Sequence, residues 1–249
     1  MKISIITAVY NRERTIAAAL ASLHAQTHPD IEHIIIDGGS TDGTLPILEA
    51  AARRPQTRLI SEPDHGIYDA LNKGLVRATG EVIGILHSDD SFADRDVLAD
   101  VARTFEAVPT DAVYGDLDYV SDDDSARIIR HWRSGAYTPA RLRRGWMPPH
   151  PALFVRKPVI DRLGGYDTSL RIAADYDAIL RWFIGARIQP AYLPRVLVRM
   201  RVGGVSNRNL ARIVQKSRED LTAMRRNKVG GLTTLAMKNL SKLPQFLAR

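Results

Sequence analysis

The chain has 249 residues, of which 45% are apolar and 25% are charged, so it is long enough for one or two domains and is not globally disordered. It contains no cysteine, which excludes disulfides and thiolate metal sites and is typical of a cytoplasmic protein. The net charge of +7 comes from residues 208–249, where ten Lys or Arg and two acids give +8, against −1 for residues 1–207.

The first half of the chain alternates apolar runs with amphipathic segments. The apolar runs predict strands at Ile3–Thr7, His33–Asp37, Arg58–Ser61, Val82–Leu86 and Ala112–Tyr114. The segments between them predict helices at Thr15–His24, Thr44–Arg53, Ile67–Ala78 and Arg95–Ala107. This order predicts an α/β fold in which a mostly parallel sheet carries helices on both faces.

A polar loop follows each of the first four predicted strands. In chain order these loops begin AVYNR, DGGSTDG, EPDHG and HSDDS. Because the carboxyl ends of parallel strands meet at one edge of a sheet, we expect the four loops to lie side by side. Ligands of such sheets bind beyond that edge, so the sequence predicts the functional site at these loops.

The loop HSDDS places Asp89 and Asp90 next to each other at the end of a buried strand. Two like charges at this distance repel unless a cation or water compensates them. Carboxylate oxygens suit Mg²⁺ or Mn²⁺, ions that also bind substrate phosphates. We assign Asp90 to the metal and Asp89 to a ribose hydroxyl or an indirect role beside the metal. The alternative is that Asp90 or Ser91 caps the following helix.

The second half of the chain, from about Asp118, is less regular. The stretch GWMPPHPALFVRK predicts a loop that leads into a strand, and GGYDTSLRIAADYDAILRWF predicts a loop that enters a helix. His150 in the first stretch could contact a diphosphate or the metal, or be an ordinary loop histidine. Asp175 in the second could act as a general base at the helix N-terminus, or simply stabilise that end of the helix.

The end of the chain reads as a strand, YLPRVLVRMRVGG, followed by a basic amphipathic segment that is helical from Asn209 and broken at Gly230–Gly231 and Pro244. This tail has no run of 18 apolar residues and cannot span a bilayer, but it could lie on an anionic inner leaflet. The alternative is a helix packed on the domain with a solvated basic face. Phe246 is the one aromatic residue among the last 42, which argues against a nucleic-acid partner.

The sequence from Asp116 to Val120, DLDYV, is similar to the nucleophile motif of haloacid-dehalogenase-type phosphatases. In that class the motif follows the first strand of the fold, whereas here it follows about the fifth. The position of the motif argues against this class, but the similarity keeps another nucleotide-sugar or phosphate-ester enzyme as one alternative function. A nucleic-acid-binding protein that uses the basic tail is the other.

Taken together, the loops resemble those of an inverting family 2 glycosyltransferase of the GT-A fold. The matching segments are SIITAVYNRERTI, HIIIDGGSTDGT, EPDHGIYDALNKGLVRATGEVIGILHSDD, HPALFVRK and GGYDTSLRIAADYDAILR. GIYDALNKG and HPALF are similar to bacterial enzymes that build cell-surface polysaccharides and glycolipids. The resemblance implies a nucleotide-sugar-binding half at 1–115 and an acceptor-binding half at 116–207, followed by a basic helical tail at 208–249.

The resemblance also implies roles for residues at matching positions. Ala8, Val9, Tyr10 and Asn11 would line the base and ribose pocket, and Asp64, Asn72 and Lys73 would border the nucleotide. Asp37 matches the first acid of the usual DDGS sequence, and Gly38 stands where the family often reads the base with a second acid.

The remaining matches concern the chemistry. Ser88-Asp89-Asp90 matches the DxD-type metal motif, with Asp90 as the principal ligand of Mn²⁺ or Mg²⁺. Asp175 matches the catalytic base of the ED motif, and Ala174 replaces the usual glutamate. The implied activity is a metal-dependent, inverting transfer of a sugar from a nucleoside diphosphate to a hydroxyl (hexosyltransferase type, EC 2.4). The expected acceptor is a lipid-linked glycan or glycolipid, and the expected location is the cytoplasm, with peripheral attachment to the inner membrane face as an option.

Overall fold

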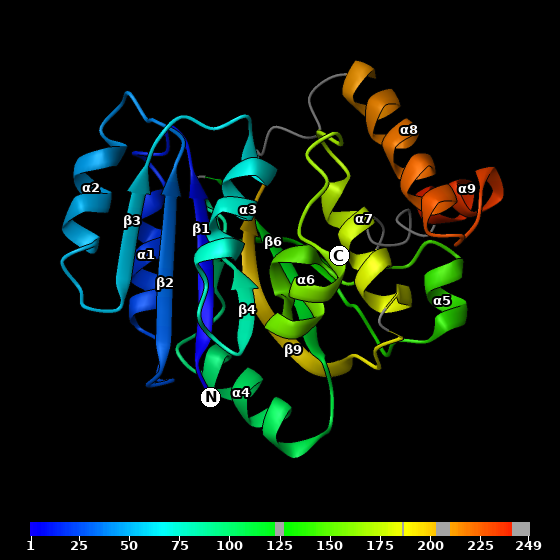
Figure 1. The fold of residues 1–249 in the computed structure, drawn as a ribbon, viewed down its shortest axis with the longest axis horizontal. Coiled ribbons are helices and arrows are strands. Elements are labelled where there is room, and N and C mark those ends of the chain that lie inside the picture. Colours follow the sequence, from blue (N-terminus) through cyan, green and yellow to red (C-terminus); the bar gives the residue numbers. More distant parts are fainter. Residues whose placement is uncertain (123–126, 186, 203–209, 241–249) are drawn as a thin grey trace.

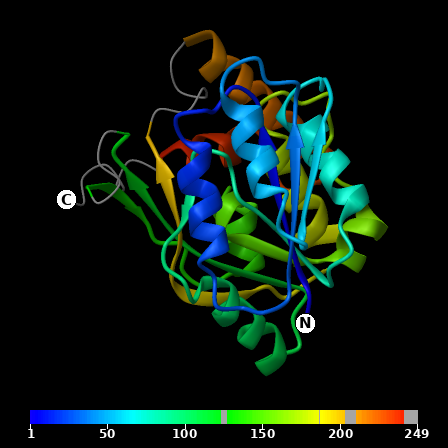
Figure 2. The ribbon, with the colours of Figure 1, turned by 90° about the vertical axis from the view of Figure 1, so that its left-hand side faces the viewer.

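The computed structural model describes residues 1–122, 127–185, 187–202 and 210–240, and its core is one curled sheet with helices on both faces (Figure 1, Figure 2). The strands are β1 (Ile3–Val9), β2 (Ile31–Asp37), β3 (Thr57–Ser61), β4 (Val82–Ile85), β5 (Ser91–Phe92), β6 (Ala112–Val120), β7 (Ile128–Trp132), β8 (Leu153–Arg156) and β9 (Ala191–Arg201). The helices are α1 (Ile16–His24), α2 (Thr44–Ala51), α3 (Ile67–Arg77), α4 (Val97–Ala107), α5 (Pro139–Arg143), α6 (Lys157–Leu163), α7 (Ala174–Leu180), α8 (Leu210–Arg226) and α9 (Leu232–Leu240). A 3₁₀ turn, η1 (His150–Ala152), precedes β8, and a π-helical turn, η2 (Arg181–Gly185), extends α7.

The strand order in the described part of the sheet is β3-β2-β1-β4-β8-β6-β9-β5, and β7 pairs with β6 beside this path. β1 is parallel to β2 and β4 on either side, and β3 is parallel to β2. β8 is antiparallel to both β4 and β6, and it joins this parallel half to a mixed half in which β6 and β9 are parallel. The predicted α/β class is confirmed, and its parallel half is the part with the four polar loops.

Two hydrophobic clusters form the core, one on each face of the sheet. Ile5 of β1 faces the cluster that includes Ile16 and Leu20 of α1, whereas its neighbour Ile6 faces the cluster that includes Leu71 of α3. Both faces of β1 are therefore covered, which is why its sequence is a continuous apolar run rather than an alternating one. Each isoleucine buried in this way contributes about 1.5–3 kcal/mol to stability.

Helix α3 lies very close to β1 because of one glycine. A Cβ atom on Gly74 would lie 2.4 Å from Cγ2 of Ile6, so another residue at this position would push α3 away from the sheet. The close packing places the first turn of α3 at the carboxyl edge of the parallel strands, beside the predicted functional loops.

The five strands and four helices predicted in the first half are all present, with small shifts at their ends. The largest difference is in β6, which continues past Tyr114 to Val120, so that Asp116 and Asp118 lie inside a strand. This extension forms because β6 pairs with β7 and β9, and both partners come from later in the chain. In the sequence, VSDDDSAR at 120–127 predicts a polar turn after this strand, and residues 123–126 of it lie outside the described residues.

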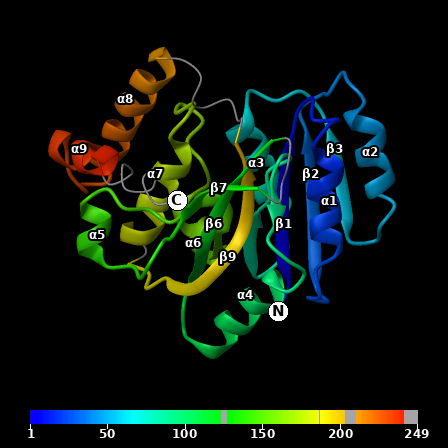
Figure 3. The ribbon, with the colours of Figure 1, turned by 180° about the vertical axis from the view of Figure 1, so that it is seen from behind.

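The basic tail forms α8 and α9, which pack beside α7 and α5 at one end of the molecule (Figure 1, Figure 3). Ala223 and Met224 of α8 and Val229 after it are buried in the same cluster as α7. The packed arrangement is thus the one adopted, with the other face of α8 exposed. The predicted start at Asn209 and the break at Pro244 lie outside the described residues. None of the described helices is both long and apolar enough to cross a bilayer.

Candidate active site

The loops after β1 and β2 are joined by hydrogen bonds, as their placement at one edge of the sheet requires. The backbone N–H of Asn11 donates to Oγ of Ser40 at 2.9 Å, and the side-chain oxygen of Asn11 accepts from the N–H of Thr41 at 2.8 Å. Asn11 has a positive φ of 51°, which turns the chain at this point. Among the residues before it, Ala8 and Val9 are buried in β1 and Tyr10 is exposed.

Asp37 is fully buried at the end of β2, and its carboxylate organises the DGGS loop. One oxygen accepts from Oγ of Ser40 at 2.5 Å, and the other accepts from Oγ of Ser61 at 2.7 Å and from the N–H of Gly39 at 3.2 Å. Both oxygens are therefore engaged within the protein. The structure gives Asp37 the role of a loop anchor that links the ends of β2 and β3.

Gly38 makes room for the carboxylate of Asp64, which comes from the loop after β3. A Cβ atom on Gly38 would lie 2.4 Å from Oδ2 of Asp64. The other oxygen of Asp64 accepts from the N–H of Gly66 at 2.8 Å, which fixes the side chain in this place. An acidic group is thus present next to position 38 although the residue there is glycine.

Asn72 and Lys73 of α3 make hydrogen bonds and an ion pair to the loops that surround this edge of the sheet. The amide of Asn72 donates to the carbonyl of Tyr166 and accepts from its N–H, both at 2.8 Å, and so ties α3 to a loop of the second half. The ammonium of Lys73 donates to the carbonyl of Pro63 at 2.8 Å and lies 3.0 Å from the carboxylate of Glu62. Both residues therefore shape the walls of the site through contacts within the chain.

Asp90 lies in a tight turn after β4, with its N–H donating to the carbonyl of His87. The side chain is only 3% exposed, and its Oδ2 atom is buried without a hydrogen-bond partner among the described residues. Burial, followed by the charge of Asp89, raises the pKa of Asp90 well above its ordinary value. The charge of Arg201 and a hydrogen bond with its backbone act on this pKa in the lowering direction, but they do not outweigh burial. A buried carboxylate oxygen without a hydrogen-bond partner is costly, so this atom is suited to a further cation.

The residues in this turn fit a divalent metal that also binds the substrate. No group of three or more His, Cys, Asp or Glu within the described ranges could hold an ion alone. Asp90 and the half-buried Asp89 offer hard oxygen ligands, and substrate phosphates would complete the coordination. The alternative role as a helix cap is excluded, because α4 begins only at Val97 and Ser91 belongs to β5.

Asp175 lies in the first turn of α7 and is half-buried. Its Oδ1 atom accepts from the N–H of Tyr176 at 2.8 Å and from the hydroxyl of Tyr68 at 3.4 Å. Burial, followed by the negative charge of Asp175, raises the pKa of Tyr68. The same two causes raise the pKa of Tyr166. Both tyrosines therefore remain protonated beside the carboxylate.

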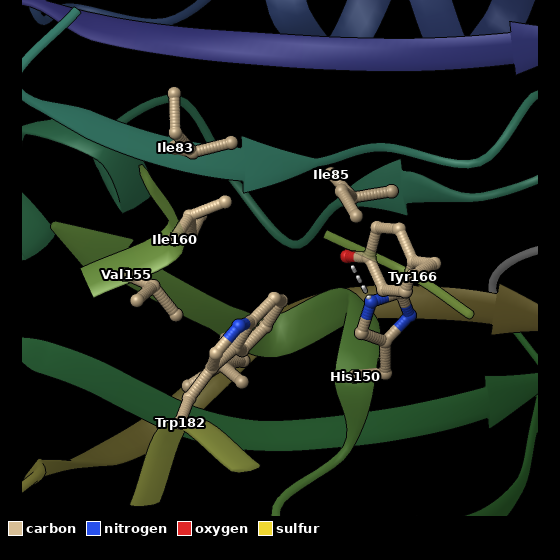
Figure 4. A pocket seen from close by; sticks show the side chains of 8 residues that line it. Ile83, Ile85, His150, Val155, Ile160, Tyr166 and Trp182 are labelled. Carbon is tan, nitrogen blue, oxygen red and sulfur yellow. Dashed lines mark hydrogen bonds between the residues drawn. The ribbon is translucent and has the colours of Figure 1, made fainter. Parts of the chain in front are cut away.

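His150 links the region of Asp175 to the turn that holds Asp90. Its Nε2 atom lies 2.8 Å from the hydroxyl of Tyr166 (Figure 4). Its ring centre lies 5.9 Å from that of His87. Burial lowers the pKa of His150 to about 4, against the opposing charge of Asp175, so the ring is neutral at pH 7. Burial also lowers the pKa of His87, while Asp89 and Asp175 act in the opposite direction. The charges of Asp175 and of Asp89 in the acidic turn therefore both act on the pKa of His87.

A small cavity lies behind His150 (Figure 4), with about 10 Å³ of water-accessible space. Its lining residues are Ile83, Ile85, His150, Leu153, Val155, Ile160, Tyr166 and Trp182. This volume is at the lower limit for one water molecule and far too small for a nucleotide. The cavity is therefore a packing gap behind the site.

The motif that is similar to the phosphatase nucleophile does not form such a site. Asp116 is 2% exposed and accepts hydrogen bonds from the hydroxyl of Tyr192 and the N–H of Ser134, both at 2.8 Å. Asp118 lies 2.6 Å from Nδ1 of His131 on β7. Both carboxylates stabilise pairing within the sheet, and nothing in their arrangement favours phosphatase chemistry.

Four residues near the site were given no role of their own in the prediction from the sequence. His87 adjoins the acidic turn, and Tyr68 shares a helix face with Asn72, so both had a local signal. Tyr166 and Glu219 had none, because each reaches the site through contacts between segments distant in the chain.

Comparison with known proteins agrees with this arrangement. Residues 4–158 match the family model described as "Glycosyl transferase family 2". A "PGL/p-HBAD biosynthesis glycosyltransferase" of Mycobacterium bovis (strain BCG / Pasteur 1173P2) is 36% identical over 208 residues, which are 82% of this chain and 78% of the relative.

Solved structures share the fold. Staphylococcus aureus TarS 1-349 superposes with a TM-score of 0.71 at 18% identity, covering 98% of this chain and 72% of TarS 1-349. The mannosyltransferase PcManGT from Pyrobaculum calidifontis, solved with GDP-Man and Mn²⁺, superposes with a TM-score of 0.66 at 21% identity, covering 99% of this chain and 73% of PcManGT.

Proposed function

The chain belongs to glycosyl transferase family 2, a hexosyltransferase-type enzyme with the GT-A fold, and on this premise we propose that it transfers a sugar from a nucleoside diphosphate to an acceptor hydroxyl with inversion at the anomeric carbon. The observation that carries the proposal is the buried oxygen of Asp90 that has no hydrogen-bond partner among the described residues. Asp90 lies in the turn with His87, and the charges of both Asp89 and Asp175 act to raise the pKa of this histidine against the effect of burial. The carboxylate of Asp90 is suited to a leaving diphosphate with its cation, and the carboxylate of Asp175 is suited to an attacking hydroxyl.

Two tasks must be performed in this reaction. The acceptor hydroxyl is a poor nucleophile until it loses its proton, and the diphosphate is a poor leaving group until its charge is compensated. Asp175 takes the proton as the hydroxyl attacks the anomeric carbon from the face opposite the diphosphate. Asp90 and Asp89 hold Mn²⁺ or Mg²⁺, which when bound supplies the positive charge for the leaving group. PcManGT, with the same fold, was solved with Mn²⁺.

The donor occupies the edge formed by the loops after β1 to β4, within the half that spans residues 1–115. Ala8, Val9, Tyr10 and Asn11 line the base and ribose, and Asp64, Asn72, Lys73, Asp89 and His150 surround the remainder of the nucleotide. Asp37 serves the donor site by anchoring the loop beside it. Asp64 provides the carboxylate next to Gly38, where the base would be read. TarS 1-349 has been solved with UDP-GlcNAc and PcManGT with GDP-Man, which supports a nucleotide sugar as the donor.

The acceptor binds over residues 116–207, and we propose a lipid-linked glycan or glycolipid in surface polysaccharide synthesis. The name of the mycobacterial relative, PGL/p-HBAD biosynthesis glycosyltransferase, supports this class of product. The tail at 208–249 places the enzyme on the inner membrane face from the cytoplasm. Its support is the exposure of Arg218 and Arg225 together with apolar Ile213 and Val214 on α8.

A thermal-shift screen of UDP-, GDP- and dTDP-sugars, with and without Mn²⁺, tests the donor and metal together. We expect one nucleotide class to raise the melting temperature only when Mn²⁺ is present. Asp90→Ala should abolish this metal-dependent shift, because it removes the principal ligand. The exposed acid Asp111, on the turn before β6, offers a control: Asp111→Asn should retain the shift.

The outcome is checked by calorimetry on the same proteins. Nucleotide binding by Asp90→Ala with an undiminished Mn²⁺ requirement would contradict the metal assignment. Product analysis separates the alternative class: release of free phosphate without sugar transfer would indicate a phosphate-ester enzyme.

A further inference from the structure

A glutamate of the C-terminal tail holds the backbone that leads to Asp175. We infer that Glu219 of α8 is a positioning residue for Asp175, an inference that rests on the proposed role of Asp175 as general base. The tail would then contribute to the chemistry itself, although it lies at the far end of the sequence.

The contact is made through two neighbouring backbone amides. Oε2 of Glu219 accepts from the N–H of Ile172 at 2.7 Å and from the N–H of Ala173 at 3.0 Å. Ala173 is the residue that precedes α7, and its side chain cannot cap the helix. Both amides lie before Ala174, the first residue of α7, so Glu219 satisfies two backbone N–H groups of the chain that enters the helix and fixes that chain in place.

The same peptide segment is held from the opposite side by α3. The hydroxyl of Tyr68 donates to the carbonyl of Ile172 at 2.8 Å, and its oxygen lies 3.4 Å from Oδ1 of Asp175, which shares the same hydrogen. The segment from Ile172 to Ala173 is thus fixed between Glu219 and Tyr68, only two residues before Asp175. A shift of this segment would move the carboxylate, and a misplacement of about 1 Å can reduce a rate about a hundredfold.

Glu219 is itself held in place on α8. Its Oε1 atom accepts from the amide of Gln215 at 2.9 Å, one helical turn away. The next residue, Asp220, is buried and pairs with Lys238 of α9 at 2.9 Å and with Lys216 at 2.7 Å. Asn227 donates to Asp177 of α7 at 3.0 Å, which fixes α8 against the helix that carries Asp175. The positioning contact is therefore rigid on both of its sides.

Three variants separate the geometry of this contact from its charge. Glu219→Ala removes both hydrogen bonds, Glu219→Asp keeps the charge but is too short to reach both amides, and Glu219→Gln keeps an acceptor oxygen of the same reach. Ser217→Ala is the control, because the hydroxyl of Ser217 on α8 donates to the carbonyl of Ile213 in the same helix. The assay follows release of nucleoside diphosphate from the nucleotide sugar selected by thermal shift, with Mn²⁺ and with water as the acceptor.

We expect Glu219→Ala and Glu219→Asp to lower kcat by about 10- to 100-fold with the KM for the nucleotide sugar changed less than about twofold. Glu219→Gln and Ser217→Ala should retain kcat within about threefold. A merely structural role would lower stability without this division between kcat and KM. If Glu219→Ala does not fold, Glu219→Asp carries the test. An unchanged kcat in Glu219→Asp, or equal losses in Glu219→Asp and Glu219→Gln, would overturn the inference.

Asp175→Asn distinguishes this inference from the proposed function. If Asp175 is the base and Glu219 acts through it, Glu219→Asp should add little further loss in the Asp175→Asn background. A slow Asp175→Asn enzyme with a fully active Glu219→Asp enzyme would reject the positioning role alone. A fully active Asp175→Asn enzyme would instead reject the assignment of the base.

Discussion

At the scale of single residues, environment decides which carboxylates of the site are available to a ligand. Asp37 and Asp90 are both buried at the ends of parallel strands. The oxygens of Asp37 are engaged by Ser40, Ser61 and Gly39, whereas Asp90 keeps one oxygen without a partner among the described residues. Two aspartates with similar sequence contexts therefore have different roles: one organises a loop, and the other is suited to a cation.

The role of Asp175 is tested by Asp175→Asn, which keeps the shape of the side chain but cannot take a proton at neutral pH. Loss of a general base costs about 10²- to 10⁴-fold in rate, and we expect a loss of this size in sugar transfer. Nucleotide binding with Mn²⁺, measured by calorimetry, should stay within about twofold of the wild-type value.

Asp161→Asn on α6 is a control for the loss of one negative charge, since Asp161 is an exposed residue whose partner is Lys157. It should leave turnover unchanged. Full turnover by Asp175→Asn would mean that another group takes the proton.

At the scale of helices and strands, the tail is a docked element with two different faces. Its inner face includes Lys238, whose ammonium pairs with Asp220 and lies 3.1 Å from the ring centre of Tyr176 on α7. A buried cation of this kind requires both partners, because an unpaired charge in the interior is strongly destabilising. Helix packing, rather than the bilayer, therefore stabilises the inner face, and the outer face keeps its cations exposed.

The exposed cations of α8 predict binding to anionic membranes. Full-length protein should sediment with vesicles that contain phosphatidylserine but not with neutral phosphatidylcholine vesicles, and added salt should weaken the binding. Each cation near such a surface contributes roughly 1 kcal/mol, so Arg218→Glu with Arg225→Glu should reduce the partition coefficient by about thirtyfold or more.

The matched control places the same charge change on the other part of the chain, at the exposed Arg53 and Arg162. Arg53→Glu with Arg162→Glu should bind vesicles almost as well as the wild type. Equal losses in the two double variants would show that net charge, rather than the tail, determines binding. Sedimentation that ignores both salt and lipid charge would exclude the membrane proposal.

At the scale of the whole molecule, burial on both faces of the sheet places titratable side chains in the interior. His33 of β2 is 2% exposed, and its Nε2 atom lies 3.0 Å from the hydroxyl of Thr7. Burial, with a smaller effect from His24, lowers the pKa of His33 to about 3. The folded protein therefore holds this ring neutral in the acid range where the unfolded chain binds a proton.

The sign of the resulting pH dependence follows from proton uptake. An unfolded histidine has a pKa of about 6.5, so between pH 6.5 and about 3 the unfolded state binds a proton that the folded state excludes at His33. The free energy of unfolding should fall with decreasing pH in this window, by up to about 1.4 kcal/mol per pH unit for this residue. His150, with its pKa lowered to about 4, acts in the same direction.

Urea denaturation at a series of pH values checks this prediction. His33→Gln removes the titrating ring, so its stability should fall less steeply between pH 6.5 and 4 than that of the wild type. His65→Gln, at an exposed loop position, should retain the full wild-type slope. Equal slopes for His33→Gln and the wild type would show that the unfolded and folded states do not differ in proton binding at His33.

Local patterns in the sequence were sufficient for the first half of the fold. Continuous apolar runs predicted β1 to β4, and their alternation with helices predicted parallel pairing at a common edge, as the register of β1 with β2 and β4 shows. The antiparallel insertion of β8 between β4 and β6 was not predicted, because pairing of Val82 with Arg156 depends on contacts across a long stretch of chain. The residue pattern of a strand is similar whichever strand it pairs with, so the pattern does not predict the pairing partner.

The sequence by itself determined the fold class and the loops of the candidate site, because hydrophobic period and turn residues act over a few positions. Only the tertiary structure decided which role each residue of those loops has. The carboxylate of Asp64 fills the space next to Gly38, and the carboxylate of Asp90 has one oxygen without a hydrogen-bond partner in the described part of the chain. Glu219 holds the backbone that leads to Asp175. Each depends on which atoms folding brings together from distant parts of the chain, and no local pattern records that.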